Sequence, residues 1–430
     1  MSEKKDAVSP RRSLKEKLKD AARAHRRRHS STGLQFVIAD SIELIPGKAW
    51  DKITHASSVY LSRNYLRVLE SAAPDGLSPR YAMVFDGKVP VVAIAAQLIE
   101  ISGKNLISQT EDAGELARGQ GRTLRKVIKE IGQSAKKKAI AKIQGRLLVC
   151  GNLLSWGQHG LAFSSDYPLP VCWSAVAEAL YRIRRAERLS GQTDIVMVKD
   201  FTKAEEDGIS ELRDFEYAPL ETDPNMVLEI PAAWRTFEDY LSDLASKYRS
   251  GAKKIIKDVT NAGITLEVLS DVTPHAERIH QLYSQVHSKA AVRPVSIEQN
   301  YLPEMASALG DDFRCTVARR GEEIVGFITT LKDGATCVGY YIGFDYEVNQ
   351  ETPLYFRLLQ VCVEDAIRFG CQRLSFGRTA LDPKARMGAR PEPMRAWLRH
   401  RQPVLNWMVK GLLGAIPHDE APDRNPFKTN

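Results

Sequence analysis

The sequence contains no apolar run long enough to cross a membrane. Its longest such run, residues 89–99, includes Pro90 and is much shorter than the about 20 residues that a membrane-spanning helix needs. No apolar segment follows the basic N-terminus, which argues against a secretory signal. The six cysteines form no Cys-x-x-Cys pair and show no ligand-like spacing with histidine. We therefore expect a cytoplasmic protein with reduced cysteines and no metal site.

The composition also lacks the biases of non-globular chains. Of the 430 residues, 43% are hydrophobic and 27% are charged. These fractions exclude a disordered chain, a collagen and a small disulfide scaffold. A chain of this length has room for two or three domains, each with its own core.

The net charge of +8 is concentrated in two segments. Residues 1–29 carry a charge of +7 and residues 118–146 carry +9, so acidic residues are in excess elsewhere. Such segments suit an anionic surface, and we expect peripheral attachment to the inner face of a membrane. The alternative is a solvated tail and a solvated helix face. Nucleic acid is disfavoured because the tail has no aromatic residue that stacks on bases.

From residue 34 onward, strand-like and helix-like patterns alternate. In the first part we expect strands at 34–39, 81–86, 89–101, 147–150 and 194–198, and helices at 60–72, 113–143 and 170–189. In the second part we expect helices at 234–261, 274–288, 297–309 and 353–369, and strands at 264–269, 314–319, 324–332, 335–344 and 373–376.

The same order of hairpin, strand, helix and strand thus occurs twice in the sequence, although the two copies share no residue-level identity. We interpret the chain as two tandem α/β domains at residues 34–225 and 226–403. A basic tail, residues 1–33, precedes them, and an apolar helix with a short tail, residues 404–430, follows. Within that last segment, residues 404–416 suit either a membrane interface or packing onto the neighbouring domain.

The second copy resembles the acyl-CoA N-acyltransferase (GNAT) superfamily. The matching segments are the hairpin 318–328, the strand 337–345, the helix from Pro353 and the strand 374–377. Residues 247–254, 341–345 and 376–378 resemble more narrowly the FemAB-like branch, whose members carry two such domains. The resemblance covers residues 240–400 well and 34–225 only by pattern. It implies tandem GNAT-like domains, each with a mixed central sheet flanked by helices.

One segment departs from the family pattern. The Gly-rich phosphate loop between the central strand and its helix is replaced by residues 346–352. The N–H groups after Thr352 are still able to accept a pyrophosphate at the helix terminus, although Pro353 removes one donor and Glu347 and Glu351 repel phosphate. The resemblance implies an acyl-CoA or acyl-carrier-protein donor, or aminoacyl-tRNA as in FemAB proteins proper.

Four residues are candidates for the chemistry of acyl transfer. Tyr341 and Asp345 share one face of the central strand. The Asp345 carboxylate is a candidate base, and the Tyr341 hydroxyl is a candidate proton donor near the leaving thiolate. The alternative is aromatic packing followed by a turn. Arg378 follows the last strand, where its planar fork suits phosphate or carboxylate, or else an ion pair with Asp382. His159 lies in a glycine-flanked loop and titrates in the range of a base, unless it is an ordinary surface histidine.

The candidates for donor binding are cations near the same segments, together with Thr352. Lys384 follows Arg378 in the loop after the last strand. Arg249 and Lys253 lie on a basic helix face that suits the phosphates of CoA, tRNA or lipid, or that is merely solvated.

We therefore expect an N-acyltransferase that moves an acyl group from a thioester to a primary amine. An amphipathic acceptor is favoured, for example a sphingoid base converted to a ceramide. The alternatives are a FemAB-like aminoacyl transferase acting on a cell-wall precursor and a non-catalytic binding module with the same fold.

Overall fold

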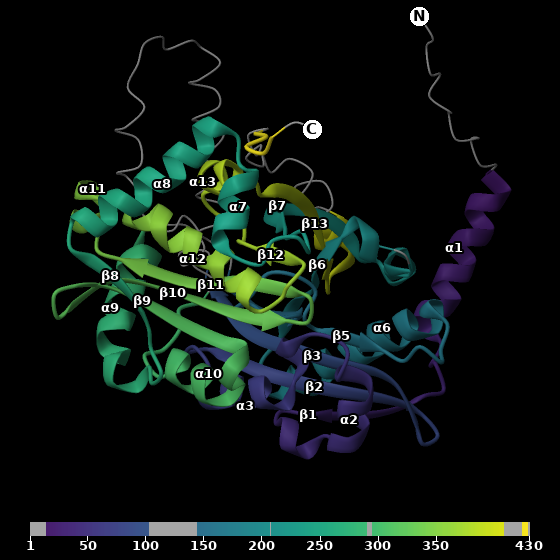
Figure 1. Ribbon diagram of the computed structural model, residues 1–430. Coiled ribbons are helices and arrows are strands. Elements are labelled where there is room, and N and C mark those ends of the chain that lie inside the picture. Colours follow the sequence, from purple (N-terminus) through teal and green to yellow (C-terminus); the bar gives the residue numbers. More distant parts are fainter. Residues whose placement is uncertain (1–13, 103–143, 207, 290–294, 408–423, 429–430) are drawn as a thin grey trace, which may run out of the picture.

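The structure is a computed structural model that describes residues 14–102, 144–206, 208–289, 295–407 and 424–428. The helix expected at 113–143 lies outside the described residues, as does most of the apolar segment 404–416. No helix of the described ranges is long and apolar enough to span a bilayer. The fold is mixed α/β, as the sequence predicts (Figure 1).

The strands form one continuous mixed sheet through both copies of the pattern. Its order is β1-β2-β3-β4-β6-β13-β7-β12-β11-β10-β9-β8, with β5 paired to β3 outside this path. The strands of the first copy are β1 (Gln35–Ala39), β2 (Leu77–Asp86), β3 (Val89–Ser102), β4 (Gln144–Cys150), β5 (Leu161–Phe163), β6 (Thr193–Thr202) and β7 (Ala218–Glu229). Those of the second copy are β8 (Ile264–Val268), β9 (Phe313–Arg320), β10 (Glu323–Asp333), β11 (Thr336–Phe344), β12 (Arg373–Ser375) and β13 (Arg390–His400).

Each copy, called a half below, contains an antiparallel meander that ends in one parallel pair. The parallel pair is β4 with β6 in the first half and β11 with β12 in the second. The connection between such strands needs a crossover. In the first half it includes α6 (Leu169–Ala186), and in the second it is made by α12 (Leu354–Arg368). The predicted doubling is confirmed.

The two halves exchange their last strands. β7 follows the first half in sequence but pairs with β12 of the second, while β13 ends the second half and pairs with β6 of the first. β7 and β13 also pair with each other, antiparallel, along almost their whole length. The exchange makes one sheet out of two.

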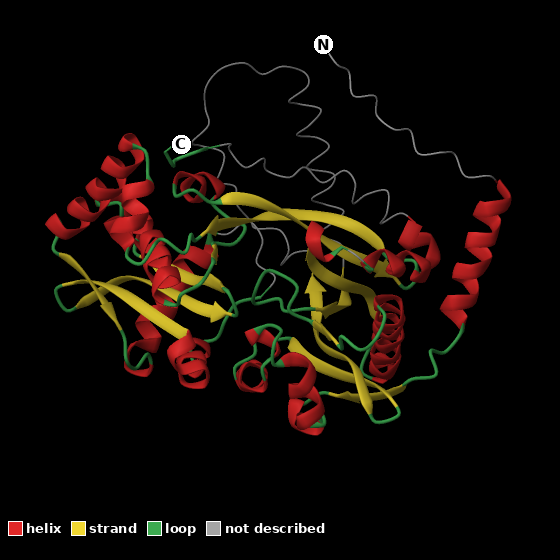
Figure 2. Cartoon of the chain, turned by 45° about the vertical axis from the view of Figure 1, so that its right-hand side comes forward, coloured by secondary structure: helices red, strands yellow, loops and turns green. Residues whose placement is uncertain are grey.

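The helices cover both faces of the sheet (Figure 2). Those of the first half are α1 (Leu14–His29), α2 (Gly47–Thr54), α3 (Arg63–Ser71) and α6. Those of the second are α7 (Phe237–Asp243), α8 (Ser246–Asn261), α9 (Ala276–Ser288), α10 (Tyr301–Leu309), α11 (Tyr346–Glu351), α12 and α13 (Leu381–Arg386). In the second half, α8 and α12 lie on one face and α9 and α10 on the other (Figure 1).

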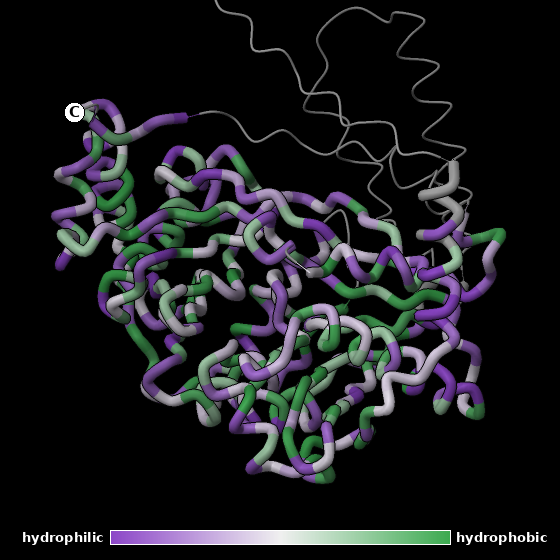
Figure 3. The backbone as a smooth tube through the Cα atoms, turned by 90° about the vertical axis from the view of Figure 1, so that its right-hand side faces the viewer, coloured by the Kyte–Doolittle hydropathy of each residue, from purple (hydrophilic) through white to green (hydrophobic). Residues whose placement is uncertain are grey.

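A shared core joins the halves on the face of α9 and α10. Trp50 and Tyr65 of the first half belong to the same buried cluster as Leu282, Tyr301 and Phe327 of the second. Two further clusters lie under α12 and under α6. Hydrophobic segments accordingly gather in the interior, and hydrophilic ones follow the outer loops (Figure 3).

A β-bulge interrupts β11 at its centre. Ile342 pairs with Ile328 and Gly339 with Thr330, so Tyr340 and Tyr341 stand opposite the single residue Thr329. The Thr329 hydroxyl fills the irregularity, since Oγ1 accepts from the Tyr341 N–H at 2.9 Å and donates to its carbonyl at 3.2 Å. A bulge of this kind re-aims side chains next to it.

Two expected elements differ from the structure. The helix expected at 234–261 is broken into α7 and α8, because Leu244 between them is extended and pairs with Phe427. The loop expected at 346–352 contains the short helix α11, which Asp345 caps. The first difference arises from a contact with a distant segment, whereas the cap of α11 is local.

Candidate functional site

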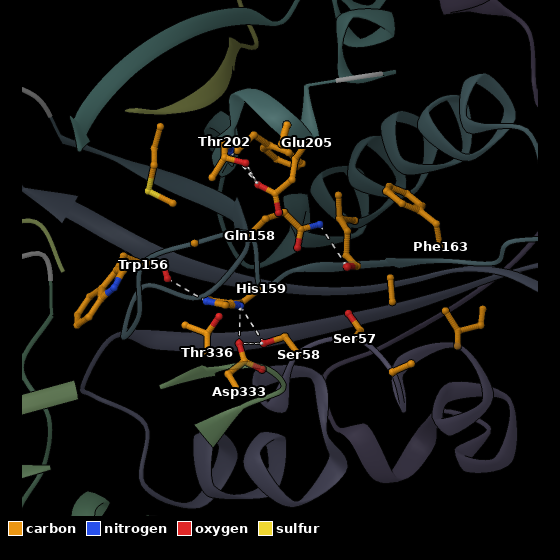
Figure 4. A pocket seen from close by; sticks show the side chains of 18 of the residues that line it. Ser57, Ser58, Trp156, Gln158, His159, Phe163, Thr202, Glu205, Asp333 and Thr336 are labelled. Atoms are coloured by element: carbon orange, nitrogen blue, oxygen red, sulfur yellow. Dashed lines mark hydrogen bonds and ion pairs between the residues drawn. The ribbon is translucent and has the colours of Figure 1, made fainter. Parts of the chain in front are cut away.

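A cavity of about 860 Å³ lies between the two halves. Figure 4 shows the labelled side chains around it, including Ser57, Ser58 and His159 of the first half and Asp333 of the second. One part of its wall is apolar and comes mainly from the first half: Leu161, Phe163, Leu169, Trp173 and Phe201. The exchanged strands supply another part of the wall, with Asn225 and Val227 from β7 and Glu392 and Met394 from β13.

His159 lies on the polar wall of this cavity and contacts both halves. Its Nε2 is 2.9 Å from the Trp156 carbonyl oxygen, and its Nδ1 is 2.8 Å from Ser58 Oγ and 3.8 Å from Asp333 Oδ2. Burial lowers the pKa of His159, against the attraction of the Asp333 carboxylate. The histidine is therefore neutral near pH 7 and is not an ordinary surface residue.

The hydrogen bonds around His159 define where it takes up a proton. A carbonyl oxygen only accepts, so Nε2 carries hydrogen toward Trp156 and the lone pair of the neutral ring is at Nδ1. If Nδ1 gains a proton, it donates to Ser58 Oγ, and the Ser58 hydroxyl donates to Asp333 Oδ2 at 3.0 Å. Serine and aspartate lie on the same ring nitrogen, unlike in a nucleophile triad, where they lie on opposite ones. Nδ1 is thus the atom at which the ring accepts a proton.

The loop that carries His159 leaves the sheet and returns at one point. Gly151 N donates to the Ala95 carbonyl, and Ala95 N donates to the Gly160 carbonyl. A Cβ at Gly160 would lie 2.3 Å from Gly151 N, so only glycine fits where the loop closes. The loop, residues 151–160, projects toward the second half, where Tyr341 Oη donates to the Leu154 carbonyl at 3.2 Å.

A group of three charges, two of them buried, fixes this loop to both halves. Lys199 Nζ donates to the Asn152 and Ser155 carbonyls, each at 2.7 Å, and lies 2.8 Å from Asp200 Oδ2. Asp200 Oδ1 pairs with the guanidinium of Arg378 from the second half. Burial opposes ionisation of Asp200, but the charges of Lys199 and Arg378 outweigh it and lower its pKa.

Arg378 is therefore engaged with Asp200 and not with Asp382. Asp382 pairs with Arg386 and Arg424 instead. Sequence reasoning did not identify Lys199 and Asp200. The sequence does contain a signal for them, since they are two successive charged residues in an otherwise apolar strand. Charged residues are rarely buried unless they are paired, so this pattern indicates a buried ion pair.

A chain of hydrogen bonds crosses the end of β12. Trp156 Nε1 donates to Ser375 Oγ at 2.7 Å, and Ser375 Oγ donates to Asn225 Oδ1 at 2.9 Å. Asn225 Oδ1 also accepts from Gly377 N at 3.1 Å. Gly377 has φ +81°, and a Cβ there would lie 2.9 Å from the Trp156 ring. The large cavity borders this segment through Trp156, Asn225 and Ser375.

Lys384 lies beside the same segment and is almost completely buried, with 4% of its surface exposed. Its Nζ donates to the Gly377 carbonyl at 3.2 Å. Among the described residues no carboxylate pairs with it, and burial lowers its pKa to about 7. Cys362 lies nearby, and its Sγ is 3.1 Å from where a Cβ of Gly339 would be. The ammonium thus sits where β11 and β12 separate.

A second cavity, of about 480 Å³, opens near Lys384 between α8, α12 and α13. Its wall is mostly apolar, and it contains Pro353 and Phe356 at the start of α12. Gln360 also lines it, with a buried Oε1 that has no partner. Four cations contribute to its lining: Lys247, Lys254, Arg386 and Arg424.

The remaining candidate residues form hydrogen bonds or ion pairs with neighbouring residues. Thr352 is buried at the start of α12, and its hydroxyl donates to the Val348 carbonyl. Arg249 donates to the Ser242 carbonyl at 3.3 Å, and Lys253 pairs with Glu238 on the exposed side of α8. Asp345 caps α11 by accepting from the N–H groups of Glu347 and Val348.

Tyr341 is partly buried in a cluster of tyrosines that lies against the bulge. Burial raises the pKa of its phenol, so the hydroxyl stays protonated and serves as a donor. Among the described residues no group of three His, Cys, Asp or Glu side chains has the arrangement of a metal site.

Comparison with known proteins agrees with this architecture. Residues 246–385 match a family model described as an acetyltransferase (GNAT) domain. No curated protein matches the sequence. Among solved structures, the chain is similar to FemX, with a TM-score of 0.53, 10% identity, and coverage of 85% of this chain and 98% of that one. It is also similar to a tandem GNAT protein from the clavulanic acid biosynthesis pathway, with a TM-score of 0.50, 10% identity, and coverage of 86% and 99%.

Proposed function

Because the chain has a tandem GNAT fold like that of FemX, with a GNAT domain at residues 246–385, we propose that it is an N-acyltransferase. It moves an acyl group from a thioester to a primary amine. The observation that carries the proposal is Lys384, a buried amine with a pKa of about 7 whose Nζ donates to the Gly377 carbonyl just after β12. A titratable group of this kind, held by a fixed carbonyl, suits a general acid–base role.

The second cavity is the proposed donor site. Its apolar walls suit the pantetheine arm and acyl chain of a thioester, and its cations suit the phosphates of that arm. Lys247 has no ion pair within the described ranges, so its charge is available. Arg249 extends this positive charge along α8, whereas Lys253 is paired with Glu238. Thr352 lies just before the helix that reaches the cavity. Acyl-CoA and acyl carrier protein share this arm, and both are proposed donors.

The large cavity is the proposed acceptor site. Its polar wall offers the Asp333 carboxylate to an ammonium group and Ser57 and Ser58 to hydroxyls. Its apolar wall suits an alkyl chain, since burying each methylene group contributes about 0.8 kcal/mol. We therefore favour a long-chain amino alcohol, such as a sphingoid base, which would be converted to a ceramide.

The proposed reaction moves two protons. The acceptor enters as an ammonium ion and gives its first proton to His159 Nδ1. Neutral Lys384 then accepts a proton from the acceptor nitrogen as that nitrogen bonds to the thioester carbonyl carbon. When the carbon–sulfur bond breaks, this proton passes from Lys384 to the thiolate. The products are an amide, a free thiol and one proton released from His159.

The function is tested with the purified full-length protein. We expect palmitoyl-CoA and sphinganine to give an N-acylated product and a free thiol in equal amounts. Transfer only from aminoacyl-tRNA would favour the FemAB-like alternative instead. Binding of thioester and amine without any transfer would favour a non-catalytic module.

Narrowing the large cavity should affect the long-chain acceptor most. Ser57 lines the cavity and is exposed, so Ser57→Trp is expected to fold and to place an indole in the opening. The KM for sphinganine should rise by about 10-fold, because part of the contact with the alkyl chain is lost. Ser270→Trp, in an exposed loop away from the described cavities, is the matched control. Equal KM values for the two variants would contradict an acceptor site here.

Removing the Asp345 carboxylate should affect stability more than turnover. Asp345→Ala removes the cap of α11 and is expected to lower the free energy of unfolding by about 1 kcal/mol. Urea unfolding measures this loss. A fall in kcat above 10-fold in the folded variant would instead make Asp345 the base, as its place after the central strand allows.

A further inference from the structure

One corner of the first half gathers three arginines around a small depression. It is lined by Arg184 of α6, by Arg399 near the end of β13 and Arg401 just after it, and by Tyr181 and Tyr217. Arg401 pairs with Asp194, but neither Arg184 nor Arg399 has an ion pair within the described residues. Burial and the charges of Arg399 and Arg401 lower the pKa of Arg184, so the cluster has excess positive charge.

Large apolar side chains are exposed at the same edge of the sheet. His400 at the end of β13 pairs with Ile195 near the start of β6, so the segments after 400 and before 193 leave the sheet together. Val404 and Trp407 of the first segment are 71% and 75% exposed, and Leu189 of the second is 99% exposed. Single exposed apolar residues are common, but apolar residues exposed together and bordered by charged ones are typical of an interaction site.

The basic helix α1 is attached to the same corner. Arg27 and Arg28 pair with Glu211 and Glu216 on and beside η6 (Ile209–Phe215). The Glu216 carbonyl also accepts from Asn406 Nδ2 at 2.9 Å, which fixes the segment that carries Trp407. Lys19, Arg23 and Arg26 of α1 remain exposed. Figure 1 shows that the C-terminal end of α1 lies near α6 and that the helix projects outward from there.

We propose that this corner, formed by Arg184, Arg399 and Arg401 with Leu189, Val404 and Trp407, binds the surface of an anionic lipid bilayer. Arginines beside protruding aromatic and aliphatic side chains match the two layers of such a surface, since lipid phosphates lie above the acyl chains. An acidic protein would satisfy the arginines but leaves the protruding Trp407 and Val404 without an apolar layer. The proposal goes beyond the acyl transfer proposed above and does not depend on it.

The test is sedimentation of the full-length protein with vesicles, without any donor or acceptor. We expect binding to vesicles of phosphatidylcholine with 30% phosphatidylglycerol and little binding to phosphatidylcholine alone. The double variant Arg184→Gln/Arg399→Gln should bind the anionic vesicles about 30-fold more weakly, because each basic residue near acidic lipid contributes about 1 kcal/mol. Trp407→Ser should weaken binding several-fold without changing its dependence on salt.

The control is Arg235→Gln/Lys257→Gln, which removes the same charge from exposed positions of the second half. It should bind vesicles as the unmodified protein does. Equal binding to neutral vesicles, unchanged binding by the Arg184→Gln/Arg399→Gln variant, or an equal loss in the control would each overturn the proposal. Displacement from the vesicles by a short DNA duplex at equal phosphate concentration would overturn it in favour of nucleic acid.

Discussion

Lys384→Met is expected to lower kcat/KM for acyl transfer by about 10³-fold, in the range typical of losing a general acid–base group. The loss should appear in kcat, because methionine keeps the apolar volume of the lysine stem but has no amine to exchange protons. Lys384→Arg should be equally inactive, since a guanidinium stays charged at any accessible pH and accepts no proton. The measurement is steady-state release of free thiol with saturating amine.

The pH dependence distinguishes this role from simple charge stabilisation. Burial lowers the pKa of Lys384 to about 7, so the neutral form that accepts a proton increases as pH rises through 7. We expect kcat/KM to rise with pH through this value and then to level off. A rate that falls as pH rises through 7 would instead assign the function to the ammonium form and would contradict a base.

The same burial predicts how the free energy of unfolding changes with pH. The unfolded chain binds a proton at Lys384 below its ordinary pKa of 10.5, whereas the folded chain does so only below about 7. Stability is therefore lost as pH falls from 10.5 toward 7. Lys384→Met lacks this dependence and should fold at least as well near neutral pH, so its inactivity would not reflect misfolding.

Asp200→Asn is expected to destabilise the protein by about 3–5 kcal/mol, the usual cost of leaving a buried charge without its partner. Two cations, Lys199 and Arg378, depend on this one carboxylate, whose side chain is 2% exposed. Asn keeps the volume and tolerates the backbone at Asp200, where φ is +65°. The change therefore isolates the charge, and chemical denaturation measures its effect.

Asp194→Asn is the control for this effect. Asp194 pairs with Arg401 at 2.8 Å, but both side chains are 28% exposed. Removing such a partly solvated pair should cost no more than about 1 kcal/mol. Equal losses for the two variants would mean that the buried group does not hold the halves together. A loss of activity greater than the loss of folded protein would indicate that loop 151–160 also shapes the site.

The sequence predicts the elements that local pattern determines. The hairpin around Gly87, the paired strands β9 and β10 and the helix α12 all follow from alternation, turn residues and capping. The family resemblance rests on the same segments, which is why the fold is predicted correctly. His159 and Lys384 were singled out from their positions in loops after strands, where side chains gather at sheet edges.

What the sequence does not predict depends on contacts between distant segments. The group Lys199, Asp200 and Arg378 joins residues almost 180 positions apart, and no spacing rule relates them. The bulge at Tyr340 and Tyr341 requires Thr329 on the neighbouring strand. The burial that lowers the pKa of Lys384 likewise exists only once α12 and the β12 segment pack against it.

The strand exchange has a consequence for how the chain folds during its synthesis. β13 completes the first half by pairing with β6, yet it is synthesised only after the other described strands of the second half, β8 to β12. Until then one edge of β6 has no partner strand. β7 likewise has no partner at one edge until β12 has been synthesised. Folding of the first half therefore finishes only after the second half has been synthesised, and a chain truncated before residue 390 leaves two unpaired strand edges, which are sites of aggregation. Neither half can therefore be transferred to another protein without the strand that the other half supplies.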